Sequence, residues 1–200
     1  MSNIPTRRDR KKAEIRLRIV QCAMRLFRER GLENTTMESI AEVVDVAKRT
    51  LYSYFPVKES IVSAYWMNYA QQKSEMLPDL LECYPDTRSR LVAVFLDAAQ
   101  GFKAEPEFAR VHFSYQFQQI GKREQPNFHN DFGVFLTAVM KAGQVKGDIR
   151  GDVSASELAT QAMFNFTAIC LIWFSNLDAF SIDERLVRIV DCFIDGVGTA

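Results

Sequence analysis

The sequence predicts an all-α protein, and three observations support that fold class. Apolar residues recur at three- and four-residue intervals through most of the 200 residues, as they do on one face of a helix. No stretch of useful length alternates apolar and polar residues as a half-buried strand does. Proline and glycine residues separate the helical stretches, and Ser-x-x-Glu patterns at Ser154 and Ser181 are typical of helix starts.

The first of two short helices near the N-terminus is predicted from a capping pattern. Thr35 and Glu38 fit a capping box that opens a helix at about Thr36 or Met37. The residues that follow on one helical face are all apolar: Met37, Ile40, Ala41 and Val44. This helix is therefore expected to bury one side.

A second short helix is expected after an interruption at residues 45–46. It begins near Ala47 or Lys48 and ends at Phe55, because Pro56 disfavours a helical conformation in the residue before it. Leu51 and Phe55 form an apolar pair that anchors this helix inward. The side chains that then point outward are those of Lys48, Arg49, Thr50 and Ser53.

Two short helices joined by a tight turn form a helix-turn-helix, whose second helix reads the major groove of DNA. Helical hairpins without a DNA function share this spacing, so the spacing alone leaves both readings open. The cationic and hydroxyl-bearing surface of residues 48–54 favours the DNA-binding interpretation. Within that interpretation, Arg49 and Thr50 are expected to read bases, with Lys48 and Ser53 as further candidates.

The charge distribution supports the same interpretation. Residues 1–66 hold 13 Lys and Arg against 8 Asp and Glu, whereas residues 67–200 hold 12 against 17, although the net charge of the whole chain is zero. A basic N-terminal domain on an acidic C-terminal domain is typical of a DNA-binding module attached to another function. The run RRDRKKAEIRLR at residues 7–18 is either a solvated tail or an arm on the DNA backbone or in the minor groove.

The amino-acid sequence of this region also resembles that of a known protein family. Residues Ile19–Tyr65 resemble the DNA-binding domain of the TetR family of bacterial transcriptional regulators. The matching elements are Ala23, Leu26-Phe27, Gly31, Thr35-Thr36-Met37, Ile40-Ala41, Val46, Lys48, Thr50-Leu51-Tyr52, Tyr54-Phe55 and Lys58-Glu59. The resemblance implies an N-terminal three-helix domain with a helix-turn-helix over residues 1–57. It also implies a helical bundle for ligand binding and dimerisation over residues 58–200.

The resemblance also assigns contacts with the DNA backbone. It implies that Tyr52, Tyr54 and Lys58 contact phosphates, and Thr36 is expected to join them because a hydroxyl at a helix N-terminus suits a phosphate oxygen. The sequence departs from the family pattern at three positions. Asp45 replaces the usual turn glycine, Ala47 replaces the usual serine cap, and Arg49 stands where many members have glycine.

Further helices are expected throughout residues 58–200. A long helix runs from Lys58 to about Met76 or Leu77 and ends before Pro78, joining the two domains. The others are expected at Thr87–Ala104, Glu107–Ile120, Phe128–Val145, Ser154–Asn176 and Ser181–Val197.

The last two helices carry more apolar surface than a small bundle requires. We therefore expect them to form a four-helix interface with a second subunit, as the family resemblance also implies; the alternative is plain monomer core. A two-fold dimer would place two recognition helices about 34 Å apart on a palindromic operator. The residues expected at this interface are Leu158, Ala162, Phe166, Leu186, Ile189, Val190, Phe193 and Val197.

An effector pocket in the C-terminal domain is implied by the resemblance. Thirteen of the fifteen phenylalanines lie beyond residue 66, and an apolar cavity with a few polar groups is what a small-molecule site needs. Core packing is the alternative for each aromatic residue. The expected lining residues are Phe95, His112, Tyr115, Gln116, Phe132, Phe135, Asn165 and Trp173, around a hydrophobic or aromatic effector of unknown identity.

Other classes of protein find little support in the sequence. His112 and His129 are the two histidines, no metal-ligand spacing or catalytic motif occurs, and the four cysteines are widely spaced. We expect no enzyme activity, metal or cofactor. The charged N-terminus and the short apolar stretch Ala162–Phe174 predict a cytoplasmic protein without a membrane span.

The most favoured function is therefore a ligand-responsive DNA-binding regulator, most often a repressor, that a small effector releases from its operator. The alternative on the same scaffold is an architectural DNA-binding protein that responds to no effector.

Overall fold

The computed structural model describes residues 6–119 and 131–198, and within them the chain forms ten helices. They are α1 (Arg7–Arg30), α2 (Met37–Val44), α3 (Lys48–Tyr54), α4 (Lys58–Ser74), α5 (Leu77–Cys83), α6 (Thr87–Ala104), α7 (Pro106–Gln118), α8 (Asp131–Lys146), α9 (Ala155–Ser175) and α10 (Ile182–Val197). Over the same residues the only strand-like feature is one isolated bridge, between Ile149 and Gly198. The all-α prediction is confirmed.

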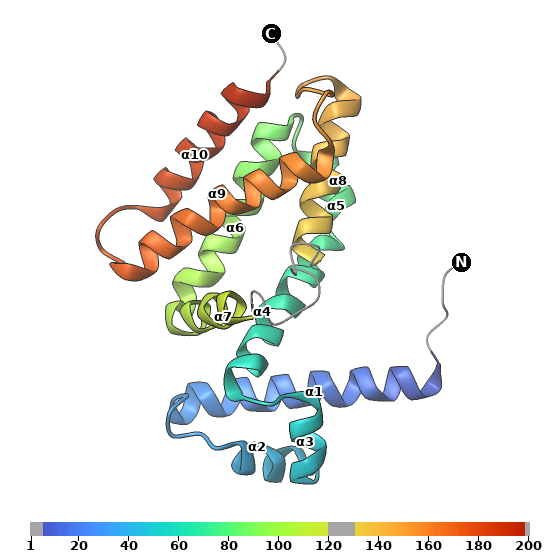
Figure 1. Cartoon of the computed structure of the whole chain (residues 1–200), viewed down its shortest axis with the longest axis vertical. Coiled ribbons are helices and arrows are strands. Elements are labelled where there is room, and N and C mark those ends of the chain that lie inside the picture. The colour runs from blue at the N-terminus through green and yellow to red at the C-terminus, as the bar shows by residue number, and fades with distance from the viewer. Residues whose placement is uncertain (1–5, 120–130, 199–200) are drawn as a thin grey trace.

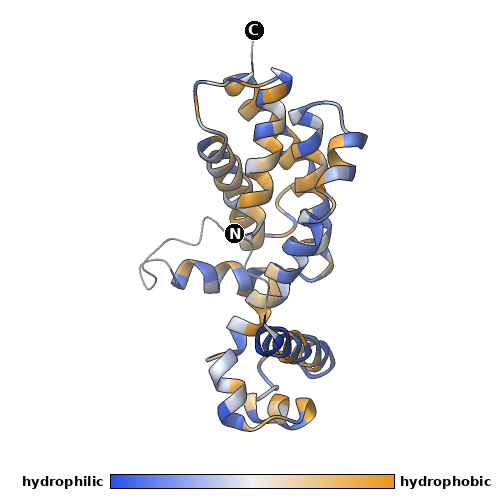
Figure 2. Ribbon diagram, turned by 90° about the vertical axis from the view of Figure 1, so that its right-hand side faces the viewer, coloured by the Kyte–Doolittle hydropathy of each residue, from blue (hydrophilic) through white to orange (hydrophobic). Residues whose placement is uncertain are grey.

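Figure 1 shows two parts, which we name the head (α1–α3) and the body (α4–α10). The head lies at one end, and α4 leads from it into the body, where α6, α8, α9 and α10 run side by side. The apolar interior of the head is built from α1, α2 and α3, with Ile19, Met24, Phe27, Ile40 and Leu51 almost fully buried, and it is continuous with the core of the body. Most hydrophobic segments lie in the body, whereas α1, seen end-on in Figure 2, is strongly hydrophilic over its first turns.

The turn between α2 and α3 follows the sequence-based expectation. Asp45 adopts φ 57° and ψ 55°, the left-handed conformation that aspartate tolerates better than most residues. Ala47 occupies the N-cap of α3 in an extended conformation and, lacking a side-chain acceptor, leaves the first amides of the helix without a side-chain cap.

The capping box predicted at Thr35 and Glu38 is wrong by one residue. Thr36 is the N-cap of α2, and its hydroxyl oxygen accepts a hydrogen bond from the amide of Ser39 at 3.1 Å. Thr35 is fully buried and donates its hydroxyl to the carbonyl of Gly31 at 2.8 Å, which ties down the loop after α1. The predicted helix start at Met37 is nevertheless correct.

The prediction missed α5. The long helix α4 ends at Ser74, and Pro78 does not stop it but stands in the first turn of α5. Proline is favoured there because the first amides of a helix have no intrahelical acceptor in any case. None of the seven residues of α5 is fully buried, so its apolar pattern is weak.

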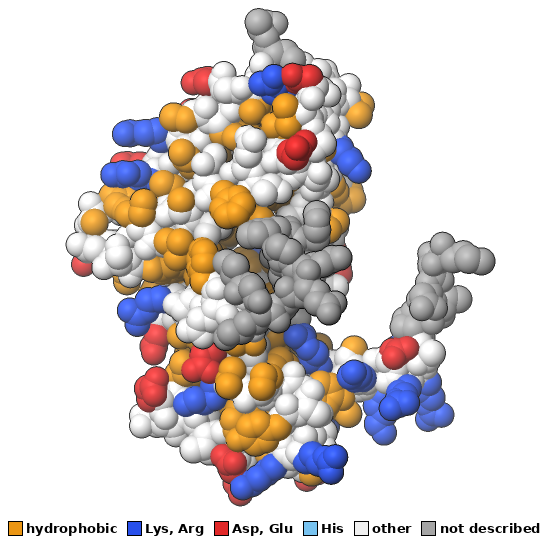
Figure 3. All heavy atoms as spheres, viewed as in Figure 1, with side chains coloured by type: hydrophobic (Ala, Val, Ile, Leu, Met, Phe, Trp, Pro, Cys, Tyr) orange, Lys and Arg blue, Asp and Glu red, His pale blue; other side chains and the backbone are white. Residues whose placement is uncertain are grey.

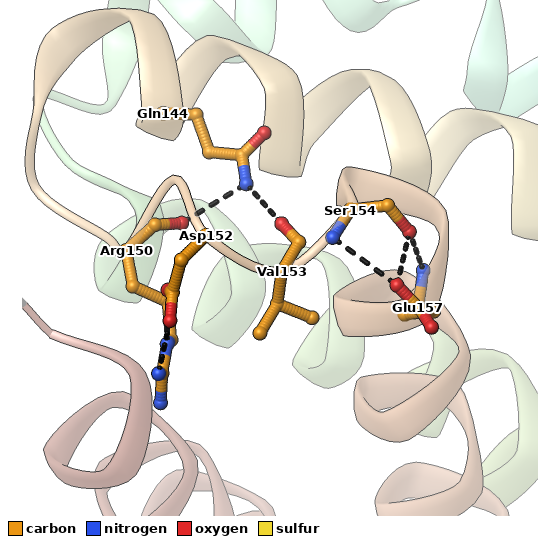
Figure 4. Close-up of polar contacts among 6 residues, drawn as sticks. All are labelled: Gln144, Arg150, Asp152, Val153, Ser154 and Glu157. Atoms are coloured by element: carbon orange, nitrogen blue, oxygen red, sulfur yellow. Dashed lines mark hydrogen bonds and ion pairs between the residues drawn. The ribbon is translucent and has the colours of Figure 1, made fainter.

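The loop from α8 to α9 is held by polar contacts (Figure 4). The Gln144 amide donates to the carbonyls of Arg150 and Val153 at 2.9 and 2.8 Å. Ser154 and Glu157 then form the reciprocal capping box predicted from the sequence. At the next helix, Ser181 caps the amide of Glu184. The expected start of α8 at Phe128 lies outside the described residues.

Helix α9 lies at the centre of the body, between α8 and α10. The apolar stretch Ala162–Phe174 is by itself too short to span a membrane, but α9 contains this stretch and is 21 residues long. By length and composition alone, α9 could cross a membrane. In its most apolar window 39% of the residues are buried inside the protein. Its buried face packs against α8 and α10, as the central helix of a bundle does.

Candidate nucleic-acid interface and interior of the body

Helix α3 presents its polar residues outward and fixes itself with two apolar side chains. Leu51 is fully buried and Phe55, just after the helix, is 2% exposed. Lys48, Arg49 and Ser53 are exposed, as the outward face of the helix requires. The amphipathic reading of the second helix is thus in agreement with the burial pattern.

The remaining predicted contacts of α3 differ in exposure. Tyr52 is 44% exposed, whereas Thr50 and Tyr54 are half-buried. Ser53 donates its hydroxyl to the carbonyl of Thr50 at 2.7 Å, so its oxygen remains available as an acceptor. Lys48 forms an exposed ion pair with Glu38 at 3.7 Å, which solvent screens strongly.

Lys58 is held more firmly than the sequence suggested. Its ammonium donates to the carbonyl of Leu32 at 2.6 Å, across the loop that joins α1 to α2. This contact ties the start of α4 to the head. An ammonium has three donors, so Lys58 can hold this carbonyl and still reach a phosphate.

Thr36 lies exposed at the N-terminus of α2. Accepting the Ser39 amide does not use the hydroxyl proton of Thr36, so this group can still donate to a phosphate oxygen. The helix N-terminus adds a favourable potential for an anion.

The basic arm is helical rather than extended. Thr6 caps α1 in a reciprocal box with Asp9, and residues 6–14 are all exposed. Lys and Arg side chains gather on the protruding end of α1 and at the tip of the head, along the edge of the molecule farthest from the body (Figure 3). An α-helix with side chains is about 10–12 Å wide and the minor groove about 6 Å, so the helical arm suits the DNA backbone and not the minor groove.

The interior of the body is an aromatic cluster that contains several predicted effector residues. Phe95 stacks on Phe166 with ring centroids 4.7 Å apart, and Phe132 lies 6.0 Å from Phe166 and 6.5 Å from Phe135. The structure thus brings three predicted ligand-binding residues together around Phe166, which the sequence had suggested for the dimer interface.

A polar group lies between α4 and α7. Ser63, which is 2% exposed, contacts His112 Nδ1 at 3.2 Å and accepts the Gln116 amide at 2.9 Å. His112 keeps some surface in contact with solvent, yet burial of its imidazole lowers the pKa to about 4, so the ring is neutral at pH 7. His112 and Gln116 are one helical turn apart on α7, as predicted; Ser63 was missed because its neighbours in sequence are apolar.

Three predicted effector residues remain: Tyr115, Asn165 and Trp173. Tyr115 and Asn165 are half-buried. Trp173 donates its indole N–H to the carbonyl of Leu177 at 3.0 Å and thereby closes the turn between α9 and α10. Trp173 is therefore a packing residue of that turn, and its donor is already used.

A groove with a volume of about 350 Å³ runs between α7 and α9. Most of its lining is aromatic or aliphatic, with one guanidinium and two hydroxyls at its sides. The lining residues are Arg110, Phe113, Ser114, Phe117, Leu171, Phe174 and Ser175. None of them was a sequence-based candidate, because a groove depends on how two helices cross.

The structure corrects the residues expected at a subunit interface. Seven of the eight lie inside the protomer, at 8% exposure or less: Leu158, Ala162, Phe166, Leu186, Val190, Phe193 and Val197. Ile189 is half-buried. The apolar side chains that α9 leaves exposed are instead Phe164, Leu171 and Ile172, at 48, 39 and 52%, and Figure 3 shows hydrophobic side chains gathered over this part of the body.

No group of three or more His, Cys, Asp or Glu side chains is placed to hold a metal ion anywhere in residues 6–119 and 131–198. All four cysteines are free thiols, and burial raises the pKa of the Cys170 thiol.

Comparisons with known proteins add to this geometry. Residues 19–65 match the family described as bacterial regulatory proteins, tetR family. The N-terminal part of the chain is therefore similar to the DNA-binding region of that family. The HTH-type transcriptional repressor KstR2 of Rhodococcus jostii (strain RHA1) is 21% identical over 188 residues, which cover 92% of this chain and 91% of the relative.

Solved TetR-like structures have the same fold over nearly the whole chain. Thermus thermophilus FadR, a TetR-family repressor in complex with lauroyl-CoA, superposes with a TM-score of 0.76 at 22% identity, covering 92% of this chain and 96% of that one. Bacillus subtilis FadR in complex with stearoyl-CoA gives a TM-score of 0.64 at 15% identity, covering 90% and 98%. Both parts of the TetR-family architecture are therefore present.

Proposed function

We propose that this chain is a TetR-family transcriptional repressor that binds an operator through α3 and leaves it when an apolar effector enters the body. The observation that carries the proposal is the exposed cationic face of α3, whose opposite side is fixed by buried apolar residues. The body of the same chain has an aromatic interior. The first part reads DNA and the second has the chemistry of a small-molecule site.

The DNA contacts divide by chemistry. Arg49 carries a planar fork of donors that can bond guanine O6 and N7, and Thr50, Lys48 and Ser53 lie beside it. The backbone contacts fall to the hydroxyls of Thr36, Tyr52 and Tyr54 and to the ammonium of Lys58. The first turns of α1 add several cations along the same edge of the head.

A homodimer is part of this proposal. Leu171 and Ile172 give α9 an exposed apolar face, and two such faces packed together would remove it from water. A two-fold axis would present two copies of α3 to a palindromic operator, about one DNA turn apart. The site of action would be the bacterial chromosome, in the cytoplasm.

The proposed effector has an apolar body. The two FadR structures hold lauroyl-CoA and stearoyl-CoA, and the body of this chain offers aromatic rings and neutral polar groups. Acyl-CoA thioesters are therefore the first compounds to test. An effector that binds better to a conformation with the wrong head spacing shifts the population and releases DNA.

The decisive experiment is a footprint on the DNA upstream of this protein's own gene, over a salt series. We expect protection of one palindrome and release by lauroyl-CoA or stearoyl-CoA, with free coenzyme A as the control. Broad, salt-sensitive coverage of all DNA, unchanged by any thioester, would instead support the architectural alternative.

A further inference from the structure

The head and the body are joined by a polar contact as well as by α4. Arg28, in the last turns of α1, donates from Nε and Nη2 to the two carboxylate oxygens of Glu105 at 2.6 and 3.2 Å. Tyr65 of α4 donates its hydroxyl to the same carboxylate at 3.0 Å, and the Arg28 guanidinium lies 5.4 Å from the centre of the Tyr65 ring. We name these three residues the latch.

Glu105 occupies a special place in the chain. It ends α6 and caps α7, so one residue forms the whole corner between these helices. Its side chain makes no capping bond to α7 and reaches instead to the head. Glutamate is not among the residues preferred at an N-cap, so its side chain can reach the head without giving up a favoured capping contact.

The electrostatics of the latch agree with its geometry. The Arg28 guanidinium lowers the pKa of Glu105, and burial together with Glu105 raises the pKa of Tyr65. The Glu105 side chain is 19% exposed and that of Arg28 45%. Most exposed ion pairs contribute little, but a two-bond arginine–carboxylate contact with a third donor is better defined than those pairs.

We propose that Arg28, Glu105 and Tyr65 are positioning residues for DNA binding, which hold the head at one orientation on the body. None of the three lies on α3, so they act on DNA only through the placement of the head. That they affect operator binding rests on the proposed function; that they hold the head does not.

The latch also lies at the end of a helix that grips α4. Helix α7 begins at the Glu105 corner, and farther along it His112 and Gln116 contact Ser63 of α4. Any ligand that tilts α7 against α4 therefore moves the carboxylate that holds Arg28. This gives the body a second connection to the head, separate from the continuous chain of α4.

The variant Glu105→Gln separates positioning from general electrostatics. Removing a negative charge strengthens DNA binding if only the overall field matters. Loss of the latch instead weakens operator binding, by about three- to tenfold for a contact of this kind. Asp183→Asn is the matched control, because it removes the same charge from the Lys103–Asp183 ion pair within the body; its operator affinity should be equal to wild type or higher.

Charge reversal gives the rescue. Arg28→Glu alone should weaken operator binding, and Arg28→Glu with Glu105→Arg should recover most of the loss. Tighter binding by Glu105→Gln, or no recovery in the double variant, would overturn the proposal.

Amide hydrogen exchange without DNA tests the latch independently of function. In Glu105→Gln, exchange should accelerate at the C-terminal turns of α1 and at the start of α7, and not in α10. Unchanged exchange at α1 would overturn the latch even if the protein binds its operator. If the wild type protects no DNA but exchange in α1 is faster in Glu105→Gln, the proposed function is wrong and the latch is retained.

Discussion

Arg49 is the residue on which the prediction of base reading depends. Its side chain is exposed on α3 and carries the donor geometry that matches guanine. Arg49→Ala should reduce discrimination at one base pair of each half-site by about 1–3 kcal/mol, measured by competition among operator variants. Arg49→Lys is the control: it keeps the charge and the salt dependence but loses the fork of donors. An equal loss on every DNA sequence would show that Arg49 contacts only phosphate.

His112 predicts a pH dependence of stability. Its pKa of about 4 in the folded chain lies below the ordinary value of 6.5, because burial disfavours the imidazolium. The unfolded chain therefore takes up the proton first as the solution is acidified. The stability that the neutral ring contributes is full above pH 6.5 and is lost as the pH falls towards 4.

The measurement is urea unfolding at pH 7 and pH 5. Wild type should lose about 1–2 kcal/mol more between these values than His112→Gln, whose amide does not titrate in this range. Equal losses in the two proteins would mean that the imidazole is solvated in the folded state.

Some single-residue features could be predicted and others could not. The left-handed turn at Asp45 and the missing cap at Ala47 follow from local chemistry, and both are present. The bond from Lys58 to the Leu32 carbonyl joins residues 26 positions apart. Such a contact depends on how α4 crosses the loop after α1, which no local pattern specifies.

At the scale of the element, α3 is a short helix with an incomplete start. Ala47 has φ −62° and ψ 142°, which a serine cap adopts without strain. Ala47→Ser should therefore stabilise the DNA-free protein by about 1 kcal/mol in urea unfolding. Ala47→Val, which adds bulk without an acceptor, should give no gain, and an equal gain from valine would contradict the capping explanation.

Element boundaries were predicted well where caps and apolar periodicity agree. Helices α9 and α10 begin directly after Ser154 and Ser181, as their sequence patterns indicate. Helix α5 was missed because it is short and half-exposed and carries in its first turn a proline that also fits a helix end. The basic arm is the start of α1, because Thr6 and Asp9 form a capping box there. This cap was missed in the sequence because it lies within a run of charged residues.

At the scale of the whole molecule, the proposed homodimer depends on the exposed face of α9. Ile172 is 52% exposed on a helix whose opposite face is core. Ile172→Glu should raise the dimer dissociation constant at least about tenfold, because it places a charge where apolar surface would be buried. Native mass spectrometry at micromolar concentration measures the change.

Val145→Glu is the matched control for that measurement. Val145 is 91% exposed near the end of α8, so the same introduction of charge should leave the oligomeric state unchanged. A wild-type protein that is monomeric at these concentrations would sink the dimer proposal.

The order and kinds of the two parts were predictable, whereas the surfaces between subunits were not. The stripe on α10 indicated burial, and Leu186 and Val190 are indeed 1% exposed. A row of apolar residues on one face of a helix does not indicate whether a helix of the same chain or of a second chain packs against that face. Here α6 and α9 of the same chain pack against α10, so the proposed dimer would use the outer side of α9.

The position of Trp66 has a spectroscopic consequence. The chain has two tryptophans, both about 5% exposed or less. The Trp66 ring lies against the ring of Tyr65, a latch residue, and the ring centroids of Trp66 and Phe102 are 5.0 Å apart. The indole N–H of Trp66 has no hydrogen-bond acceptor among the described residues. Replacing Trp173 by phenylalanine leaves one tryptophan, at the junction of the head and the body. Its emission reports water or a ligand carbonyl reaching that indole, so the protein carries its own optical probe of the junction.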